Sequence, residues 1–83
     1  MSYELLYFKA KWCYPCKRIG PKFEYMLKDS TLNVNRIDID EKPELADQYN
    51  IKYIPTFILL KDKIEKFDDF DELKRRLQEL KLI

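Results

Sequence analysis

The sequence predicts an α/β fold in which three helices flank a four-stranded mixed sheet, in the order β-α-β-α-β-β-α. Two apolar runs, residues 4–8 and 56–60, are typical of strands buried on both faces of a sheet. Residues 14–28 and 69–80 carry apolar side chains at the spacing of amphipathic helices. The chain has one glycine and no repeat, low-complexity tract or linker, so we expect a single domain over residues 1–83.

The first two elements are a strand and a long helix. The strand runs from Glu4 to Phe8 and ends just before the cysteine motif. We expect the helix to run from Tyr14 to about Lys28, because apolar residues recur there at helical spacing: Ile19, Phe23, Met26 and Leu27. Gly20-Pro21 lies inside this helix and should kink it, since proline removes a backbone donor and clashes with the preceding turn.

The middle of the chain is predicted to form a second strand and a short helix. The strand covers Val34 to Ile39. Asp40 together with Pro43 resembles a helix start, and we expect this helix to end near Asn50.

The last third is predicted to form a hairpin and a closing helix. Thr56 to Leu60 is a second doubly buried strand, and a turn leads into an edge strand from Ile64 to Phe67. Asp69 with Glu72 resembles a capping box at the start of the last helix. One apolar stripe on that helix is interpreted as core: Phe70, Leu73, Leu77 and Leu80. A strand, a crossover helix and a parallel strand, followed by this hairpin, give a mixed sheet covered on both faces.

The charge balance argues against nucleic-acid and membrane partners. The 83 residues include 16 Lys+Arg and 15 Asp+Glu, a formal net charge of +1, which gives no global field to attract a polyanion. The N-terminal residues show no basic leader followed by an apolar run, and no segment approaches a membrane-spanning length. We therefore expect a cytoplasmic protein, and a monomer.

Both cysteines lie in KWCYPCK, residues 11–17, and three uses of the pair compete. As a structural staple, a Cys13–Cys16 bond closes only about four residues and contributes roughly 2 kcal/mol, against about 3 for fifteen. Structural zinc takes four Cys or His ligands, and this chain has two cysteines and no histidine. A redox pair fits best, because residues i and i+3 in the first turn of a helix lie within disulfide range.

The start of a helix also suggests how the two thiols divide the chemistry. Unpaired backbone N–H groups and the positive end of the helix dipole favour a thiolate at Cys13, and Lys11 and Lys17 add positive charge. Cys13, expected to be exposed, is thus the candidate nucleophile. Cys16, one turn further in, is the candidate resolving thiol.

The residues from Trp12 to Lys17 (WCYPCK) resemble the Trp-Cys-Gly-Pro-Cys-Lys active site of the thioredoxin family. The resemblance extends to Pro21, which matches the family's helix-kinking proline, and to residues 36–57. It implies the thioredoxin fold and a cis peptide bond between Ile54 and Pro55, with the Ile54 backbone free to pair with an extended substrate.

The resemblance implies a protein-disulfide reductase that binds no cofactor and is regenerated by an external reductant. Cys13 and Cys16 are then catalytic. An apolar rim is expected to dock substrates, comprising Trp12, Tyr14, Pro15, Ile54 and Pro55, with Tyr53 beside them. Tyr3, Tyr25 and Tyr49 are interpreted as core or boundary packing.

Besides Tyr14, which stands where the family motif has glycine, the sequence departs from the family at three places. It lacks the additional N-terminal strand and helix of full-length thioredoxins, and so resembles the shortened, glutaredoxin-sized members known from archaea and viruses. The family's buried aspartate falls on Tyr7, which leaves Asp38, Glu24 or a water as candidate proton acceptors for Cys16. The glycine that precedes the family's last helix is also missing, since residues 67–69 read FDD.

Other functions fit the same motif. A glutaredoxin-type enzyme would take its electrons from glutathione, and a disulfide oxidant or isomerase would run the exchange in other directions. A non-enzymatic accessory subunit is the alternative from a different class, including one that bridges an iron–sulfur cluster in a dimer. The missing glycines argue against a tight glutathione site. We therefore expect a flavin-dependent thioredoxin reductase rather than glutathione as the electron donor.

Overall fold

The computed structural model describes residues 2–83 and has the predicted order of elements. The strands are β1 (Glu4–Lys9), β2 (Asn33–Asp38), β3 (Thr56–Leu60) and β4 (Ile64–Phe67). The helices are α1 (Tyr14–Leu27), α2 (Pro43–Gln48) and α3 (Phe70–Glu79). No helix in this part of the chain is both long and apolar enough to cross a membrane.

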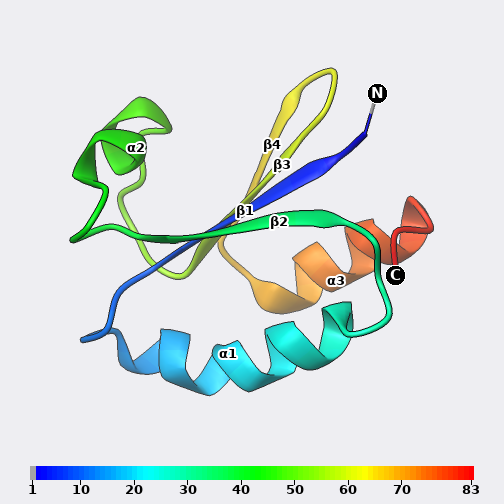
Figure 1. The fold of residues 1–83 in the computed structure, drawn as a ribbon, viewed down its shortest axis with the longest axis horizontal. Coiled ribbons are helices and arrows are strands. Elements are labelled where there is room, and N and C mark those ends of the chain that lie inside the picture. The colour runs from blue at the N-terminus through cyan, green and yellow to red at the C-terminus, as the bar shows by residue number, and fades with distance from the viewer. Residues whose placement is uncertain (1) are drawn as a thin grey trace.

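The four strands form one mixed sheet in the order β2-β1-β3-β4 (Figure 1). β1 pairs in parallel with β2, from Glu4 opposite Asn33 to Lys9 opposite Asp38. The β1–β3 and β3–β4 pairs are antiparallel. The two doubly buried strands predicted from the sequence, β1 and β3, are thus the two central strands of the sheet.

The sheet separates two apolar clusters, because successive side chains of a strand point to opposite faces. On one face the odd-numbered residues of β1 and β3 pack under α1 and α3: Leu5, Tyr7, Phe57 and Leu59 against Phe23, Leu27, Leu73 and Leu77. On the other face Leu6, Phe8, Ile37 and Ile58 pack under α2 through Leu45 and Tyr49. Figure 1 shows α1 and α3 side by side below the sheet and α2 on the opposite side.

Two predicted helix starts use different caps from those expected. Asp69 is the N-cap of α3, but its side chain makes no capping hydrogen bond, so the capping box with Glu72 is wrong. Only the Asp69 backbone carbonyl contributes, accepting from the Leu73 N–H at 3.1 Å. The N-cap of α2 is Lys42, with Pro43 as the first helical residue, and the Asp40 carboxylate is engaged elsewhere.

Two helices end in left-handed residues that are not glycine. Asn50 follows α2 with φ 54°, and Lys81 follows α3 with φ 58°. The next N–H groups, of Ile51 and Leu82, bond back to the carbonyls of Ala46 at 2.8 Å and Leu77 at 2.9 Å. This is the Schellman pattern of helix termination, which usually takes glycine at the left-handed position. At the end of α3 it turns Leu82 back toward α1, where its carbonyl accepts a bond from Ser30.

The first helix continues through Pro21 to Leu27 and carries an unexpected exposed aromatic. Its buried side is Cys16, Phe23 and Leu27, as the apolar spacing predicts. Tyr25 is 71% exposed, so its assignment to core or boundary packing is wrong. It lies on the solvent side of α1, where the Lys28 ammonium sits 4.5 Å from its ring centroid.

Candidate active site

The two cysteines form a disulfide at the N-terminus of α1. Their Cα atoms are 5.2 Å apart, as the i, i+3 spacing predicts. Cys13 is the N-cap, with extended backbone (φ −83°, ψ 107°), and Cys16 lies in the first turn. The Cys16 backbone N–H donates to Cys13 Sγ at 3.2 Å. A free helix N–H group therefore points at the sulfur of Cys13, where it can stabilise negative charge.

Both cysteines are almost fully buried. Cys13 is 3% exposed and Cys16 is 5% exposed, so the expectation of an exposed Cys13 is wrong. The reason is tertiary packing, because Ala10, Ile39 and Ile54 surround the pair. Solvent exposure therefore does not indicate which thiol is the nucleophile, and any difference between them must come from the groups around each sulfur.

The loop before β3 lies directly against Cys13. The peptide bond between Ile54 and Pro55 is cis, which confirms that prediction. The Ile54 carbonyl oxygen is 3.8 Å from Cys13 Sγ. The Thr56 hydroxyl donates to the Tyr53 carbonyl at 2.5 Å and bridges the loop across this bond. Any molecule that reaches Cys13 Sγ therefore also meets the backbone of this loop.

Exposed aromatic side chains border the site. Trp12 is 65% exposed, Tyr14 69% and Tyr53 74%, whereas Ile54 and Pro55 are half-buried. The Trp12 indole N–H donates to the Asp40 carboxylate at 2.8 Å, which holds the ring beside Cys13. Large exposed aromatics are typical of binding surfaces. Substrate binding by these residues, and by Pro15 at the exposed start of α1, stays a prediction.

On the far side of the disulfide, Cys16 lines an open cavity of about 670 Å³ together with Tyr7 and Asp38. The Tyr7 hydroxyl donates to the Cys16 carbonyl at 3.4 Å. Burial, with a smaller contribution from the charge of Glu24, raises the pKa of Tyr7 above its usual value of 10.0. The phenol therefore stays protonated near pH 7 and cannot accept the Cys16 proton as a phenolate.

The structure reduces the candidate proton acceptors for Cys16. Arg36 donates to both carboxylate oxygens of Glu24 at 2.6 Å, and chiefly this hydrogen bonding lowers the pKa of Glu24. A carboxylate held in this way is a poor proton acceptor, and Glu24 does not line the cavity. Asp38 does line it, with one oxygen accepting the Asp40 N–H at 2.9 Å and the other left without a protein donor among residues 2–83.

The Glu24–Arg36 ion pair predicts a pH-dependent contribution to stability. Because the Glu24 pKa is lower in the folded protein, the pair stabilises the fold above the unfolded pKa of about 4.5 and loses this effect as pH falls through the folded value. Both side chains are partly exposed, so Glu24→Gln should lower the free energy of unfolding at pH 7 by less than about 1 kcal/mol. Urea denaturation at pH 7 and pH 3 should show the difference shrinking at the lower pH.

Asp47→Asn is the matched control, since Asp47 is exposed on α2 and its side chain makes no hydrogen bond or ion pair with residues 2–83. It should change stability little at either pH. A Glu24→Gln effect of equal size at both pH values would contradict the assignment to the ion pair.

Two side chains at the site escape prediction from the sequence. Asp40 accepts a hydrogen bond from Trp12, which is 28 positions away in the sequence. Arg36 donates a hydrogen bond to Glu24, which is 12 positions away. No local spacing signals either contact. Metal ligands are not gathered anywhere in residues 2–83, where no three His, Cys, Asp or Glu side chains cluster as a metal site would require.

Comparison with known proteins identifies relatives over most of the chain. A family model described as Thioredoxin matches residues 2–81. Thioredoxin-2 of Pyricularia oryzae is 40% identical over 69 residues, which cover 82% of this chain and 40% of the relative. A thioredoxin H-type of Oryza sativa subsp. indica is 42% identical over 59 residues, covering 70% and 48%. The chain therefore spans about half the length of these curated relatives.

Solved structures are similar over almost the whole chain. Thioredoxin NaTrxh from Nicotiana alata superposes with a TM-score of 0.86 at 31% identity, covering 94% of this chain and 72% of the other. Fasciola hepatica thioredoxin gives a TM-score of 0.82 at 30% identity, with coverage of 99% and 82%. The strand order, the cysteine pair and the cis Ile54–Pro55 bond thus belong to a chain whose fold is similar to those of solved thioredoxins.

Proposed function

The chain belongs to the thioredoxin family, and on this basis we propose that it is a thiol–disulfide oxidoreductase that reduces disulfides in proteins. The observation that carries the proposal is the Cys13–Cys16 disulfide at the start of α1, with the Cys16 N–H on Cys13 Sγ and the Ile54 carbonyl beside it. The structure describes the oxidised form of this pair.

In the reduced protein, the Cys13 thiolate attacks one sulfur of the substrate disulfide. A Cys13–substrate bond forms, the substrate S–S bond breaks, and the departing substrate sulfur takes up a proton. Cys16 then loses its proton and attacks Cys13 Sγ, so that the Cys13–Cys16 bond forms while the substrate leaves as a dithiol. Two electrons and two protons pass to the substrate, and an external reductant returns them to the cysteines.

The proton of Cys16 leaves through the cavity that Cys16 shares with Tyr7 and Asp38. The proposed acceptor of this proton is the Asp38 carboxylate, acting through water. Both oxygens of the Glu24 carboxylate already accept hydrogen bonds from Arg36, and the Tyr7 phenol stays neutral. Tyr7 positions Cys16 through the bond to its carbonyl.

The proposed partners are proteins. Trp12, Tyr14 and the Ile54-Pro55 loop offer aromatic and backbone contacts suited to a polypeptide. Residues 67–69 carry side chains where a glycine would let glutathione approach the backbone closely, so a flavin-dependent thioredoxin reductase, using NADPH, is the proposed electron donor. We propose that the protein works as a monomer in the cytoplasm.

The test compares two donor systems on one disulfide-bonded protein, such as insulin. Reduction with NADPH and a thioredoxin reductase should be faster than reduction with glutathione, NADPH and glutathione reductase. A faster glutathione-driven rate would place the protein with the glutaredoxins. The Cys13→Ser/Cys16→Ser double variant should have no activity with either donor. Absence of turnover by the unmodified protein with both donors would favour the non-enzymatic accessory role.

A further inference from the structure

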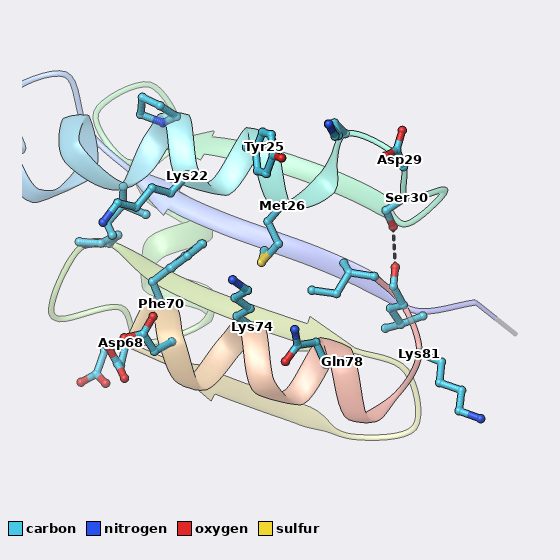
Figure 2. A pocket seen from close by; sticks show the side chains of 18 of the residues that line it. Lys22, Tyr25, Met26, Asp29, Ser30, Asp68, Phe70, Lys74, Gln78 and Lys81 are labelled. Atoms are coloured by element: carbon cyan, nitrogen blue, oxygen red, sulfur yellow. Dashed lines mark hydrogen bonds between the residues drawn. The ribbon is translucent and has the colours of Figure 1, made fainter.

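A groove of about 1260 Å³ runs between α1 and α3 and begins at the cysteine motif. Pro15 and Pro55, which flank the disulfide, line its near end, and Leu82 and Ile83 line its far end. Figure 2 shows the groove from close by, with α1 and α3 as its walls. The groove is thus continuous with the surface on which a substrate disulfide must lie.

The floor of the groove is apolar. Ile19 and Met26 on α1, Phe70 on α3 and Leu82 beyond it line the groove. All four are half-buried and pack against the core cluster beneath. In Figure 2 Met26 and Phe70 project into the space between the helices. These side chains offer a partner apolar area without any need to unfold the domain.

Charge along the α3 wall changes sign from one end to the other. Asp68, Asp69 and Asp71 lie at the start of α3 and line the groove. Lys74 lies in the middle of the groove, and Lys81 lies at its far end with its side chain directed away from α1 (Figure 2).

The α1 wall carries one charge of the other sign at each end. Lys22 lies toward the near end, and Asp29 lies at the far end (Figure 2). Lys28, next to Asp29 in the sequence, also lines the groove, with its ammonium over the Tyr25 ring. The near end therefore has three acids and one base, the middle has one base, Lys74, and the far end has two bases and one acid. None of these eight side chains belongs to an ion pair found in residues 2–83.

The far end of the groove is held in place by hydrogen bonds. The Ser30 hydroxyl donates to the Leu82 carbonyl at 2.8 Å (Figure 2). It also accepts from the Leu32 N–H at 3.1 Å. The left-handed Lys81 and the Leu82–Leu77 backbone bond fix the same turn. Binding here therefore requires little ordering of the protein, which lowers its entropic cost.

We propose that this groove binds the segment of the substrate protein that adjoins its disulfide, and that it selects a segment basic near the reacting cysteine, apolar in the middle and acidic at the far end. The inference rests on the proposed function and adds a substrate class to it. The 14 residues of α1 extend about 21 Å, the length of roughly six residues in extended conformation. Complementary charge then sets the orientation of the segment and raises its association rate.

The test measures how fast the reduced protein reacts with synthetic peptides. Each peptide has one cysteine, activated as a mixed disulfide with thionitrobenzoate, an adjacent arginine, three apolar residues and two far-end residues that are glutamates or lysines. Cys13 attacks the peptide sulfur and releases the coloured thionitrobenzoate anion. The segment is placed on either side of the cysteine, and the faster arrangement is used. The peptide with the acidic far end should react roughly fivefold faster at low salt, and added salt should reduce the ratio.

Charge reversal in the groove provides the critical comparison. Lys74 and Lys81 are exposed and outside the catalytic machinery, so the Lys74→Glu/Lys81→Glu variant should fold normally and should prefer the lysine peptide. Lys63→Glu, in the β3–β4 turn outside the groove, should keep the original preference. The rate of each peptide with the protein is divided by its rate with dithiothreitol, which corrects for the intrinsic reactivity of the peptide disulfide. Exchanging the peptide arginine for glutamate should lower this corrected rate. The Asp68→Lys/Asp71→Lys variant should not show that decrease.

Failure of this inference is distinguishable from failure of the proposed function. Equal rates for the two far ends, or an unchanged preference in Lys74→Glu/Lys81→Glu, would overturn the groove assignment even where both peptides react rapidly. Loss of reaction with the symmetric thionitrobenzoate disulfide, which has no peptide segment, would instead overturn the proposed redox chemistry.

Discussion

Replacing Cys16 with serine is expected to make the protein accumulate stable mixed disulfides with its substrates. Cys13 can still attack, but the serine hydroxyl cannot complete the exchange. Attack by a well-oriented group on the same chain can reach an effective concentration of roughly 10⁵ M. Its loss should lengthen the lifetime of the mixed disulfide by at least about 100-fold. Non-reducing gels and mass spectrometry of the Cys16→Ser protein, incubated with a disulfide-bonded protein, measure the adduct directly.

Cys13→Ser is the matched variant and should trap almost nothing. Both thiols are nearly buried, so this difference must come from their surroundings. Only Cys13 Sγ receives the Cys16 N–H, at 3.2 Å, and only Cys13 Sγ lies 3.8 Å from the Ile54 carbonyl of the cis-proline loop. Equal trapping by the two variants would contradict the assignment of Cys13 as nucleophile.

The order of the elements is predictable from the sequence because local patterns determine it. The two apolar runs form the two central strands, β1 and β3, whose side chains pack against apolar residues on both faces of the sheet. The bounds of β2 differ by one residue from the prediction. The sequence favours Val34 to Ile39, but parallel pairing with β1 aligns Asn33 with Glu4 and Asp38 with Lys9. Pairing with a distant strand, rather than local composition, thus sets where β2 begins and ends.

Polar side chains are less predictable than apolar ones. Asp40 and Asp69 each stand where a local pattern predicts a helix cap, yet neither side chain caps a helix. Asp40 instead binds the Trp12 indole, a partner 28 positions away. A short polar side chain can satisfy its hydrogen bonds in several ways of similar energy, and the choice depends on which groups the fold brings near.

The candidate site is predictable in its chemistry but not in its solvent exposure. The Cys-x-x-Cys spacing predicts the disulfide, and the family resemblance predicts the cis bond before Pro55. The burial of Cys13 depends on Ile39 and Ile54, which reach it from other parts of the chain. Tyr25 is the opposite case, because its aromatic side chain is exposed to solvent. Its exposure follows from the way α1 is oriented on the sheet, which the sequence does not give.

The largest effect on stability is expected for Phe57→Ala. Phe57 is the second residue of β3 and is fully buried. Its ring lies 5.0 Å from that of Tyr7 and 5.6 Å from that of Phe23, measured between centroids. Removing it leaves a cavity between the sheet and both helices of that face. Such a change costs roughly 3–5 kcal/mol. A domain of this size has a total stability of only about 4–12 kcal/mol, so much of it should be lost.

Tyr25→Ala is the control, because it removes an aromatic ring of similar size from the exposed side of α1. Urea denaturation of the two variants should show a large loss of unfolding free energy for Phe57→Ala and a change within about 0.5 kcal/mol for Tyr25→Ala. Similar losses for both would contradict the placement of Phe57 at the centre of the core. Because Phe57 contacts Tyr7, and Tyr7 bonds to the Cys16 carbonyl, Phe57→Ala should also slow the reaction of the cysteine pair in the fraction that remains folded.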